Sequence, residues 1–281
     1  MALLGAHVSI SGGIENAPMR GDKLQCDTMQ IFSKQQLRWE AKSLSEKEVT
    51  QYKENLGKST VRSVVIHTSY LMNLGSPEKE KLKKSRNTFL EEIIRAEYLH
   101  ASGLVLHPGS HMNKISEDVC LNLIAESINI MIDQTKGSKL KLLIENTAGQ
   151  GSTLGYTFEH LAKIIELVQD KDRVGICFDT CHAFAAGYDM RTEKAYAETF
   201  RKFHDSIELD KIAIFHINDS KKGLGTRIDR HENLGYGCIG KDPFRLLVND
   251  IRFKNIPMIL ETPGGDEWFK TNLKLLRGMI T

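Results

Sequence analysis

The stretch LKLLIE, at residues 140–145, shows the pattern that repeats along the chain and decides the fold. Apolar residues stand at consecutive positions, as in a parallel strand that is buried on both faces, and the run ends on an acidic residue. Seven further runs are also short and mainly apolar, and all but one of them end on His, Asp or Glu; they are ALLGAH (2–7), TMQIF (28–32), RSVVIH (62–67), GLVLH (103–107), RVGICFD (173–179), KIAIFH (211–216) and PMILE (257–261). We therefore expect eight parallel strands.

Longer stretches with helical periodicity separate these runs. At 117–134, apolar residues such as Ile124, Ile128 and Met131 recur on one helical face. Further helical stretches are expected at 44–56, 78–101, 157–169, 192–209, 242–253 and 266–279. Strand–helix alternation repeated eight times predicts a closed (β/α)₈ TIM barrel of the α/β class. Because no linker or low-complexity segment interrupts the pattern, we expect residues 1–281 to form a single domain.

Composition and charge exclude several classes of protein. The 281 residues are 41% hydrophobic and 26% charged, which is ordinary for a globular protein, and the net charge of +2 does not by itself indicate a nucleic-acid partner. The five cysteines form no CxxC pair, which argues against a disulfide framework and a Cys₄ zinc site. No apolar run approaches the roughly 20 residues of a membrane span, and no signal peptide opens the chain. We therefore expect a cytoplasmic protein without a membrane partner.

The residues that end the eight runs share one kind of chemistry. Seven of the eight are metal-ligand or acid–base types; the set is His7, Phe32, His67, His107, Glu145, Asp179, His216 and Glu261. Apolar residues stand two positions earlier and face the same way, because strand side chains alternate; they are Val65, Val105, Leu143, Cys177, Ile214 and Ile259. This pattern predicts an apolar layer inside the barrel and a polar rim at the carboxyl ends of the strands, where barrel active sites lie.

A single His or Glu at a strand end is usually a hydrogen-bonded loop residue. Seven such residues directed at one axis would instead bury uncompensated charge unless a metal were bound. The segment DTCH (179–182) adds His182, and the Gly-rich loop near residue 230 adds Asp229 and His231. The nine candidate metal ligands are then His67, His107, Glu145, Asp179, His182, His216, Asp229, His231 and Glu261.

Five imidazoles and four carboxylates favour zinc or a related transition metal over Mg²⁺. Catalytic zinc keeps about three protein ligands and an open position, so nine ligands suit three metals, or two metals with additional supporting residues. Closely spaced metals activate water and clamp the oxygens of a phosphoryl displacement. Glu145 is the natural bridging carboxylate between two of them.

Long, order-specific motifs identify a family. The sequence resembles the endonuclease IV family from His7 to the C-terminal helix, in the motifs GAHVSISGG (5–13), HTSYLMNLGSP (67–77), HPGS (107–110), ENTAG (145–149), DTCHAFAAGYD (179–189), HINDSK (216–221), DRHENLGYGCIG (229–240) and LETP (260–263). Members of that family are trinuclear-zinc apurinic/apyrimidinic endonucleases of base-excision repair. The resemblance therefore implies three zinc ions per chain, with Mn²⁺ as an alternative at one site.

The resemblance also distributes the ligands among the three ions. It gives the first ion His67, His107 and Glu145, the second Glu145, Asp179, His216 and Glu261, and the third His182, Asp229 and His231. His7 resembles a residue that lines the site without binding metal. The implied reaction is hydrolysis of the DNA phosphodiester 5′ to an abasic site, which leaves a 3′-hydroxyl and a 5′-deoxyribose phosphate.

In that reaction a metal-bridging hydroxide would be the nucleophile, and the third zinc would stabilise the leaving oxygen. Glu145 and Glu261 would be the catalytic carboxylates, with Glu261 helping to orient the hydroxide. The expected partner is double-stranded DNA that contains abasic sites, and the precedent of the family favours a monomer.

The expected DNA contacts follow from two loops. Tyr70 and Leu71, just past His67, match the loop that inserts into DNA in the family, as enzymes that bend DNA and flip bases insert side chains into the stack. In KQQLRW (34–39) the family often has Arg where this chain has Leu37, so the residue that fills the abasic gap is left open. Arg38, one place after Leu37, is a further candidate for DNA binding. For phosphate contacts the candidates are basic residues with ordinary solvated surface charge as the alternative; they are Lys34, Lys221, Lys222, Arg227 and Arg230.

Two other functions compete with the nuclease. A sugar isomerase or epimerase on a similar barrel would hold one or two metals with mainly carboxylate ligands, whereas the additional set of His182, Asp229 and His231 favours a third metal. A DNA-binding protein with purely structural zinc would show closed, Cys-rich sites. The metal content of the protein distinguishes a sugar isomerase from the nuclease. Treatment with a chelator distinguishes structural zinc, because an enzyme should lose cleavage before it loses its fold.

Overall fold

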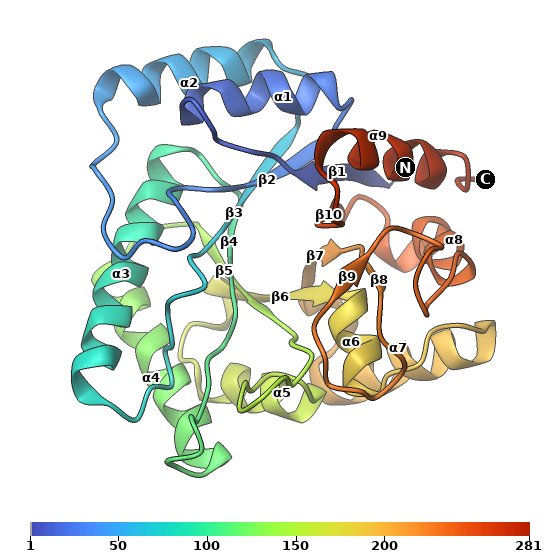
Figure 1. Cartoon of the computed structure of the whole chain (residues 1–281). Coiled ribbons are helices and arrows are strands. Elements are labelled where there is room, and N and C mark those ends of the chain that lie inside the picture. The colour runs from blue at the N-terminus through green and yellow to red at the C-terminus, as the bar shows by residue number, and fades with distance from the viewer. Residues whose placement is uncertain (1) are drawn as a thin grey trace.

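The computed structural model describes residues 2–281, in which eight parallel strands close into a barrel (Figure 1). The strands are β1 (Leu3–His7), β2 (Thr28–Phe32), β3 (Ser63–His67), β4 (Gly103–Leu106), β5 (Lys141–Glu145), β6 (Val174–Asp179), β7 (Ile212–His216) and β10 (Pro257–Leu260). Strands that follow one another in the chain are neighbours in the barrel, and β10 pairs with β1 to close it. The predicted (β/α)₈ TIM barrel is confirmed.

Helices lie at the seven predicted places around the barrel. They are α2 (Glu46–Lys58), α3 (Lys79–Tyr98), α4 (Glu117–Gln134), α5 (Phe158–Leu167), α7 (Glu193–Ile207), α8 (Asp242–Asn249) and α9 (Gly265–Arg277). Capping side chains determine where several helices begin. Ser45 and Glu48 form a capping box at the N-terminus of α2, and Ser116 accepts a hydrogen bond from Val119 N at the N-terminus of α4. The helix expected to reach residue 253 ends at Asn249, and a separate 3₁₀ turn (Ile251–Phe253) follows it.

Two short helices and a small hairpin were not predicted. Helices α1 (Ala17–Lys23) and α6 (Thr180–Ala186) have seven residues each, which is too short for apolar periodicity to show. After β7, the chain forms an antiparallel pair of two-residue strands, β8 (Asp219–Ser220) and β9 (His231–Glu232), which lies beside α6 (Figure 1). Helix α6 follows β6 and the hairpin follows β7, so both shape the barrel mouth, whereas α1 connects β1 to β2.

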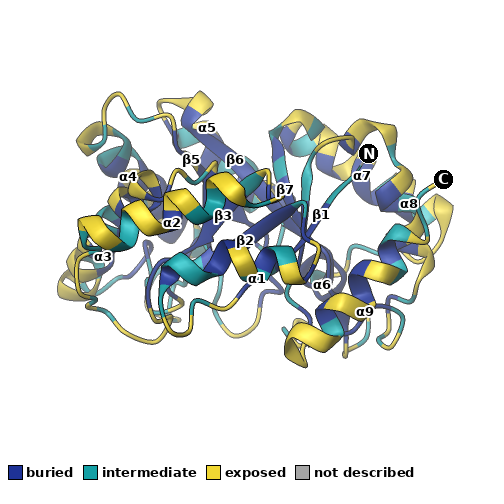
Figure 2. Ribbon diagram, turned by 90° about the horizontal axis from the view of Figure 1, so that it is seen from above, coloured by how far each residue is buried: buried dark blue, intermediate teal, exposed yellow. Residues whose placement is uncertain are grey.

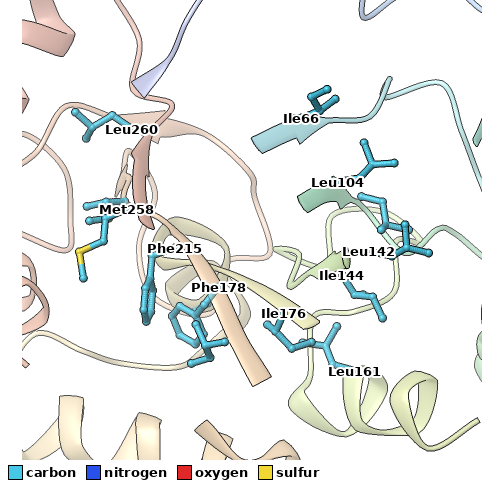
Figure 3. Packing of buried hydrophobic residues seen from close by; sticks show 14 of the residues in the cluster. Ile66, Leu104, Leu142, Ile144, Leu161, Ile176, Phe178, Phe215, Met258 and Leu260 are labelled. Atoms are coloured by element: carbon cyan, nitrogen blue, oxygen red, sulfur yellow. The ribbon is translucent and has the colours of Figure 1, made fainter. Parts of the chain in front are cut away.

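The strands pack through two separate apolar layers. The inner layer holds six side chains, each at most 3% exposed; they are Val65, Val105, Leu143, Cys177, Ile214 and Ile259, as predicted. Outward-facing residues such as Ile66, Leu104 and Phe215 belong to the larger layer between the barrel and its helices (Figure 3). Exposed residues are confined mainly to the outer faces of the helices and to loops (Figure 2). Within residues 2–281, no helix has the length and apolar character needed to span a membrane.

Candidate metal centre

The nine predicted ligands converge at the carboxyl ends of the barrel strands. Their ligand atoms fall into three groups, in each of which the atoms lie within 4.8 Å of one another. The groups are His67, His107 and Glu145; Glu145, Asp179, His216 and Glu261; and His182, Asp229 and His231. The structure thus brings together the same three sets that the family resemblance implies.

Glu145, at the end of β5, is fully buried and stands between the first two groups. Its Oε2 lies 3.2 Å from Nε2 of His67 and 3.3 Å from Nε2 of His107. Its Oε1 lies 3.1 Å from Nδ1 of His216 and 3.2 Å from Nδ1 of His182. The two oxygens of one carboxylate therefore face different ligand groups, which is the arrangement that a bridging ligand needs.

The second group surrounds His216 at the end of β7. Nδ1 of His216 lies 3.1 Å from Oε2 of Glu261 and 3.9 Å from Oδ2 of Asp179. Asp179 and His216 are fully buried, whereas the side chain of Glu261 is 11% exposed. Glu261 is therefore the carboxylate of this group that solvent can reach from the barrel mouth.

The third group combines α6 with the loop that leads into β9. Nε2 of His182 lies 3.2 Å from Oδ2 of Asp229, and Nε2 of His231 lies 3.5 Å from Oδ1 of the same carboxylate. Among the described residues, both Nε2 atoms are buried without a hydrogen-bond partner. Buried polar atoms are normally satisfied, so two unpaired imidazole nitrogens beside a carboxylate fit the ligand set of a transition metal.

Hydrogen bonds select which nitrogen each imidazole presents to the centre. Three ligand histidines donate Nδ1–H to a backbone carbonyl, which leaves the lone pair on Nε2. These bonds run from His67 to Thr68 O over 2.7 Å, from His182 to Asn146 O over 2.9 Å and from His231 to Glu261 O over 3.3 Å. In each case the free nitrogen is the one that faces the ligand groups.

The pKa values of the ligand residues show that positive charge stabilises the centre. Burial alone would raise the pKa of the Glu145 carboxyl, but the charge of His216 beside it holds that pKa well below its ordinary value. Burial likewise opposes a charge on His182, yet Asp179 holds its pKa well above the ordinary value. These two pKa shifts favour the charged forms of Glu145 and His182. Divalent metal ions at these groups would supply positive charge directly.

Two buried thiols also lie within reach of the ligand groups. Cys177 is close to Glu145 and His216, and Cys181 is close to Asp179 and His231. Burial raises the pKa of both thiols to about 12. The nine oxygen and nitrogen ligands form three groups without either thiol.

His7 lies beside the second group, where the resemblance places a residue that lines the site. Its Nδ1 is 3.2 Å from Oε1 of Glu261, and its ring lies 6.4 Å from that of His67. Burial lowers the pKa of His7, against the opposing effect of Glu261. Its position therefore suits a neutral neighbour of Glu261.

The sequence reasoning missed the amides that hold Asp179 and Asp229. Asn146 Oδ1 accepts from Asp179 N over 2.7 Å, and Asn218 Nδ2 donates to Asp179 Oδ2 over 2.7 Å. Gln150 Oε1 accepts from the backbone N–H of Asp229 over 2.9 Å. The signal was present in the motifs ENTAGQ and HIND, where an amide stands one, two or five residues after a ligand.

The candidate DNA residues divide into exposed and buried ones. Tyr70 is 49% exposed, and its ring lies 5.2 Å from that of His67 and 5.6 Å from that of His107, so it stands at the rim of the centre. Leu71 beside it is half-buried. Arg38 and Arg230 are exposed, as is Leu37, whose exposed fraction is 70%.

Lys34 does not lie where a phosphate contact requires it. Its side chain is 2% exposed, and Nζ donates to Trp39 O and to Glu91 Oε2, each over 3.1 Å. The prediction for Lys34 is therefore corrected: its ammonium group holds the loop at 33–42 against α3. No local pattern indicates this pairing, because Glu91 lies 57 residues away.

The same face of α3 holds both loops that carry candidate DNA residues. Glu92 accepts from Ser33 Oγ over 2.5 Å and from Ser69 N over 3.3 Å, and it is 1% exposed. Arg95 donates to Ser33 Oγ over 3.1 Å, to Ser33 O and to Lys42 O over 3.0 Å. One buried pair of residues thus connects the 33–42 loop with the loop at Ser69 and Tyr70.

The closed barrel and the His and carboxylate groups at its mouth define a TIM-barrel enzyme, and residues 22–279 match the family described as Xylose isomerase-like TIM barrel. A probable endonuclease 4 from Geotalea daltonii is 49% identical over 279 residues, which cover 99% of this chain and 98% of that protein. The chain belongs to the endonuclease IV family and is a hydrolase of the nuclease class.

Solved structures agree with this assignment. Endonuclease IV from Thermus thermophilus matches with a TM-score of 0.87 at 33% sequence identity, over 98% of each chain. A D-tagatose 3-epimerase-like protein matches with a TM-score of 0.76 at 19% identity, over 98% of this chain and 96% of that one. The second likeness shows a shared fold alone, because barrels of one architecture support many functions.

Proposed function

We propose that this protein hydrolyses the DNA phosphodiester 5′ to an abasic site and leaves a 3′-hydroxyl and a 5′-deoxyribose phosphate. The proposal rests above all on the third ligand group, because His182, Asp229 and His231 stand beside a two-group centre that shares Glu145. A dinuclear barrel would not need this additional set. Similarity to proteins named endonuclease 4 supports DNA as the substrate.

The three groups would hold three zinc ions, with Mn²⁺ as an alternative at one of them. Five imidazole nitrogens and four carboxylates suit zinc, and the free nitrogens selected by hydrogen bonding suit it further. When bound, such ions lower the pKa of water towards neutrality and neutralise charge on phosphate oxygens. Cys-free ligands at an open barrel mouth argue against purely structural zinc.

Glu261 is the residue that we assign to orienting the attacking water. Its Oε1 lies 2.6 Å from Nε2 of Gln30 and 3.2 Å from Nδ1 of His7, and its Oε2 lies 3.1 Å from Nδ1 of His216. These contacts, with the nearby imidazoles, hold the pKa of Glu261 below its ordinary value despite burial. An ionised, partly exposed carboxylate at the mouth can accept a hydrogen bond from water, whereas Glu145 is enclosed.

A small cavity beside the first ligand group is compatible with a substrate that lies across the barrel mouth. This cavity is lined by His67, His107, Tyr70 and Met72, among others, and measures about 10 Å³. Sites that enclose small molecules measure roughly 300–1,000 Å³. A cavity of about 820 Å³ lies between α2 and α3, but none of the nine ligands lines it. A duplex lying across the mouth needs no enclosed pocket.

The proposed DNA contacts are Tyr70, Leu71, Arg38 and Arg230, all at exposed or half-buried positions of loops. We expect Tyr70 and Leu71 to enter the distorted base stack and the two arginines to contact phosphates. The protein would act as a monomer. Incision of a duplex with one abasic residue tests the reaction, and metal content tests the centre. Three zinc ions per chain would support the nuclease, whereas one or two Mg²⁺ or Mn²⁺ ions would favour an isomerase.

A further inference from the structure

Gln30 is a fully buried polar residue that stands between the apolar residues Met29 and Ile31 of a strand. It lies on β2, where its Cα pairs with that of His7 on β1 and with that of Val65 on β3. Val65 belongs to the inner layer of the barrel, and His7 lines the mouth. The side chain of Gln30 therefore enters the barrel interior directly below the ligand groups.

The amide of Gln30 contacts three residues of the centre at hydrogen-bond distance. Nε2 lies 2.6 Å from Oε1 of Glu261 and 2.9 Å from Nδ1 of His7. Oε1 lies 2.8 Å from Nε2 of His216. Chemistry fixes this orientation, because an ionised carboxylate only accepts hydrogen bonds and must face the NH₂ group. The carbonyl oxygen is then left for the imidazole.

This orientation determines the tautomer of His216. A carbonyl oxygen only accepts, so Nε2 of His216 must carry a proton, and with a metal bound the lone pair of the ring would be on Nδ1. Nδ1 is the atom that lies 3.1 Å from both Glu145 Oε1 and Glu261 Oε2. Backbone carbonyls select the tautomer of the other three histidines described above, whereas a side chain does so for His216.

We propose that Gln30 is a positioning residue that fixes His216 as an Nδ1 ligand and turns Glu261 towards the second metal. Residues that bond to metal ligands in this way typically contribute 10- to 100-fold to metal affinity or activity. The inference rests on the proposed metal centre, but it does not depend on which phosphodiester is cut.

The first test compares zinc retention in the zinc-loaded variants Gln30→Met and Gln30→Glu with that in the unchanged protein. Met fills similar space without hydrogen bonds, whereas Glu keeps an acceptor for His216 and places a second carboxylate against Glu261. Under a fixed concentration of chelator, we expect Gln30→Met to lose one zinc per chain about 10- to 100-fold more readily. If the contact with His216 makes the larger contribution, Gln30→Glu should retain zinc almost as well as the unchanged protein. If the contact with Glu261 makes the larger contribution, Gln30→Glu should retain zinc as poorly as Gln30→Met.

The control is Gln51→Met, which makes the same substitution at an exposed position of α2 and should retain zinc normally. Circular dichroism confirms that each variant is folded. Equal zinc retention by Gln30→Met, Gln30→Glu and the unchanged protein would overturn the inference. An unchanged protein that binds no zinc would overturn this inference and the proposed centre together, whereas zinc binding without DNA cleavage would overturn the proposed reaction alone.

The second test observes the tautomer directly by imidazole ¹⁵N NMR of the zinc-loaded protein. We expect the His216 ring to show a proton on Nε2 that exchanges slowly with water, because Gln30 shields and accepts it. In Gln30→Met this proton should exchange faster, and in Gln30→Glu it should stay protected. A His216 signal that is identical in all three proteins, or a proton on Nδ1, would contradict the assigned role. A merely space-filling Gln30 would not move this signal.

Discussion

The carboxylate of Asp179 accepts a hydrogen bond from the backbone N–H of His182 over 2.7 Å. Asp179 ends β6 and at the same time caps α6, so one residue belongs to the second ligand group and starts the helix that carries the third. Its other oxygen lies 3.7 Å from Nε2 of His231. The second and third groups are therefore built around a common carboxylate.

Replacing His182 tests whether the third group is a separate metal site. In His182→Ala we expect zinc content to fall from three ions to two per chain, because the first two groups do not need this imidazole. Cleavage should fall by about 100-fold or more, as when one stabilising group for a leaving oxygen is removed. Metal analysis and single-turnover cleavage measure the two effects. Retention of three zinc ions would contradict the assignment of His182.

Replacing Glu261 separates chemistry from binding. Glu261→Gln keeps the size of the side chain but removes the charge that accepts a hydrogen bond from water. We expect the cleavage rate to fall by about 10²- to 10⁴-fold, with affinity for abasic duplex largely kept. Gel-shift titration and single-turnover kinetics provide the measurements. Lost binding, or retained cleavage, would count against the role given to Glu261.

Arg95 tests the connection between α3 and the DNA-facing loops. Arg95→Met removes three hydrogen bonds to the loop at 33–42 and leaves buried acceptors unpaired. We expect the free energy of unfolding to drop by about 1–3 kcal/mol, and KM for abasic duplex to rise more than kcat falls. Zinc content should not change.

The matched control is Arg201→Met, which removes exposed ion pairs with Glu198 and Asp205 on α7. Because exposed pairs contribute at most about 1 kcal/mol, it should leave both stability and KM nearly unchanged. Urea unfolding and steady-state kinetics measure both variants. An unchanged KM in Arg95→Met would show that the loops do not depend on this contact.

Tyr70 tests how the protein engages the substrate. Its ring stands over His67 and His107 and is half-exposed, so Tyr70→Ala should weaken binding of abasic duplex by about 1–3 kcal/mol, the range for one aromatic stacking contact. Tyr98→Ala provides the control, because Tyr98 is 56% exposed at the end of α3. Fluorescence anisotropy measures affinity. Equal losses in the two variants would argue against insertion of Tyr70.

The barrel could be predicted because its signals are local and repeated. The strands show consecutive apolar residues, and seven of the eight runs have a polar end. The alternation within a strand is enough to place Val65 and Leu143 in the inner layer. The ligand groups could be anticipated for the same reason, since the carboxyl ends of all strands meet at one mouth. Short elements such as α6 were missed, because seven residues show too little periodicity.

Long-range pairing could not be read from the sequence. From the sequence, Lys34 was expected to be a free cation in a loop that binds DNA. Its ammonium group instead pairs with Glu91 and Glu92, which lie on a helix more than fifty residues away in the chain. Gln30 left a faint signal as a polar residue between two apolar ones, yet its partner His216 lies 186 residues further on. Such contacts depend on the register of strands, which no local pattern specifies.

The most direct test of the proposed reaction is incision of an end-labelled duplex with one tetrahydrofuran residue. This abasic analogue cannot undergo β-elimination, so a nick must come from hydrolysis. With zinc-loaded protein we expect one cut immediately 5′ to the analogue, a 3′ end that a DNA polymerase extends, and no cut in the intact duplex. An uncut strand with zinc bound, or equal cutting of the intact duplex, would contradict the proposed function.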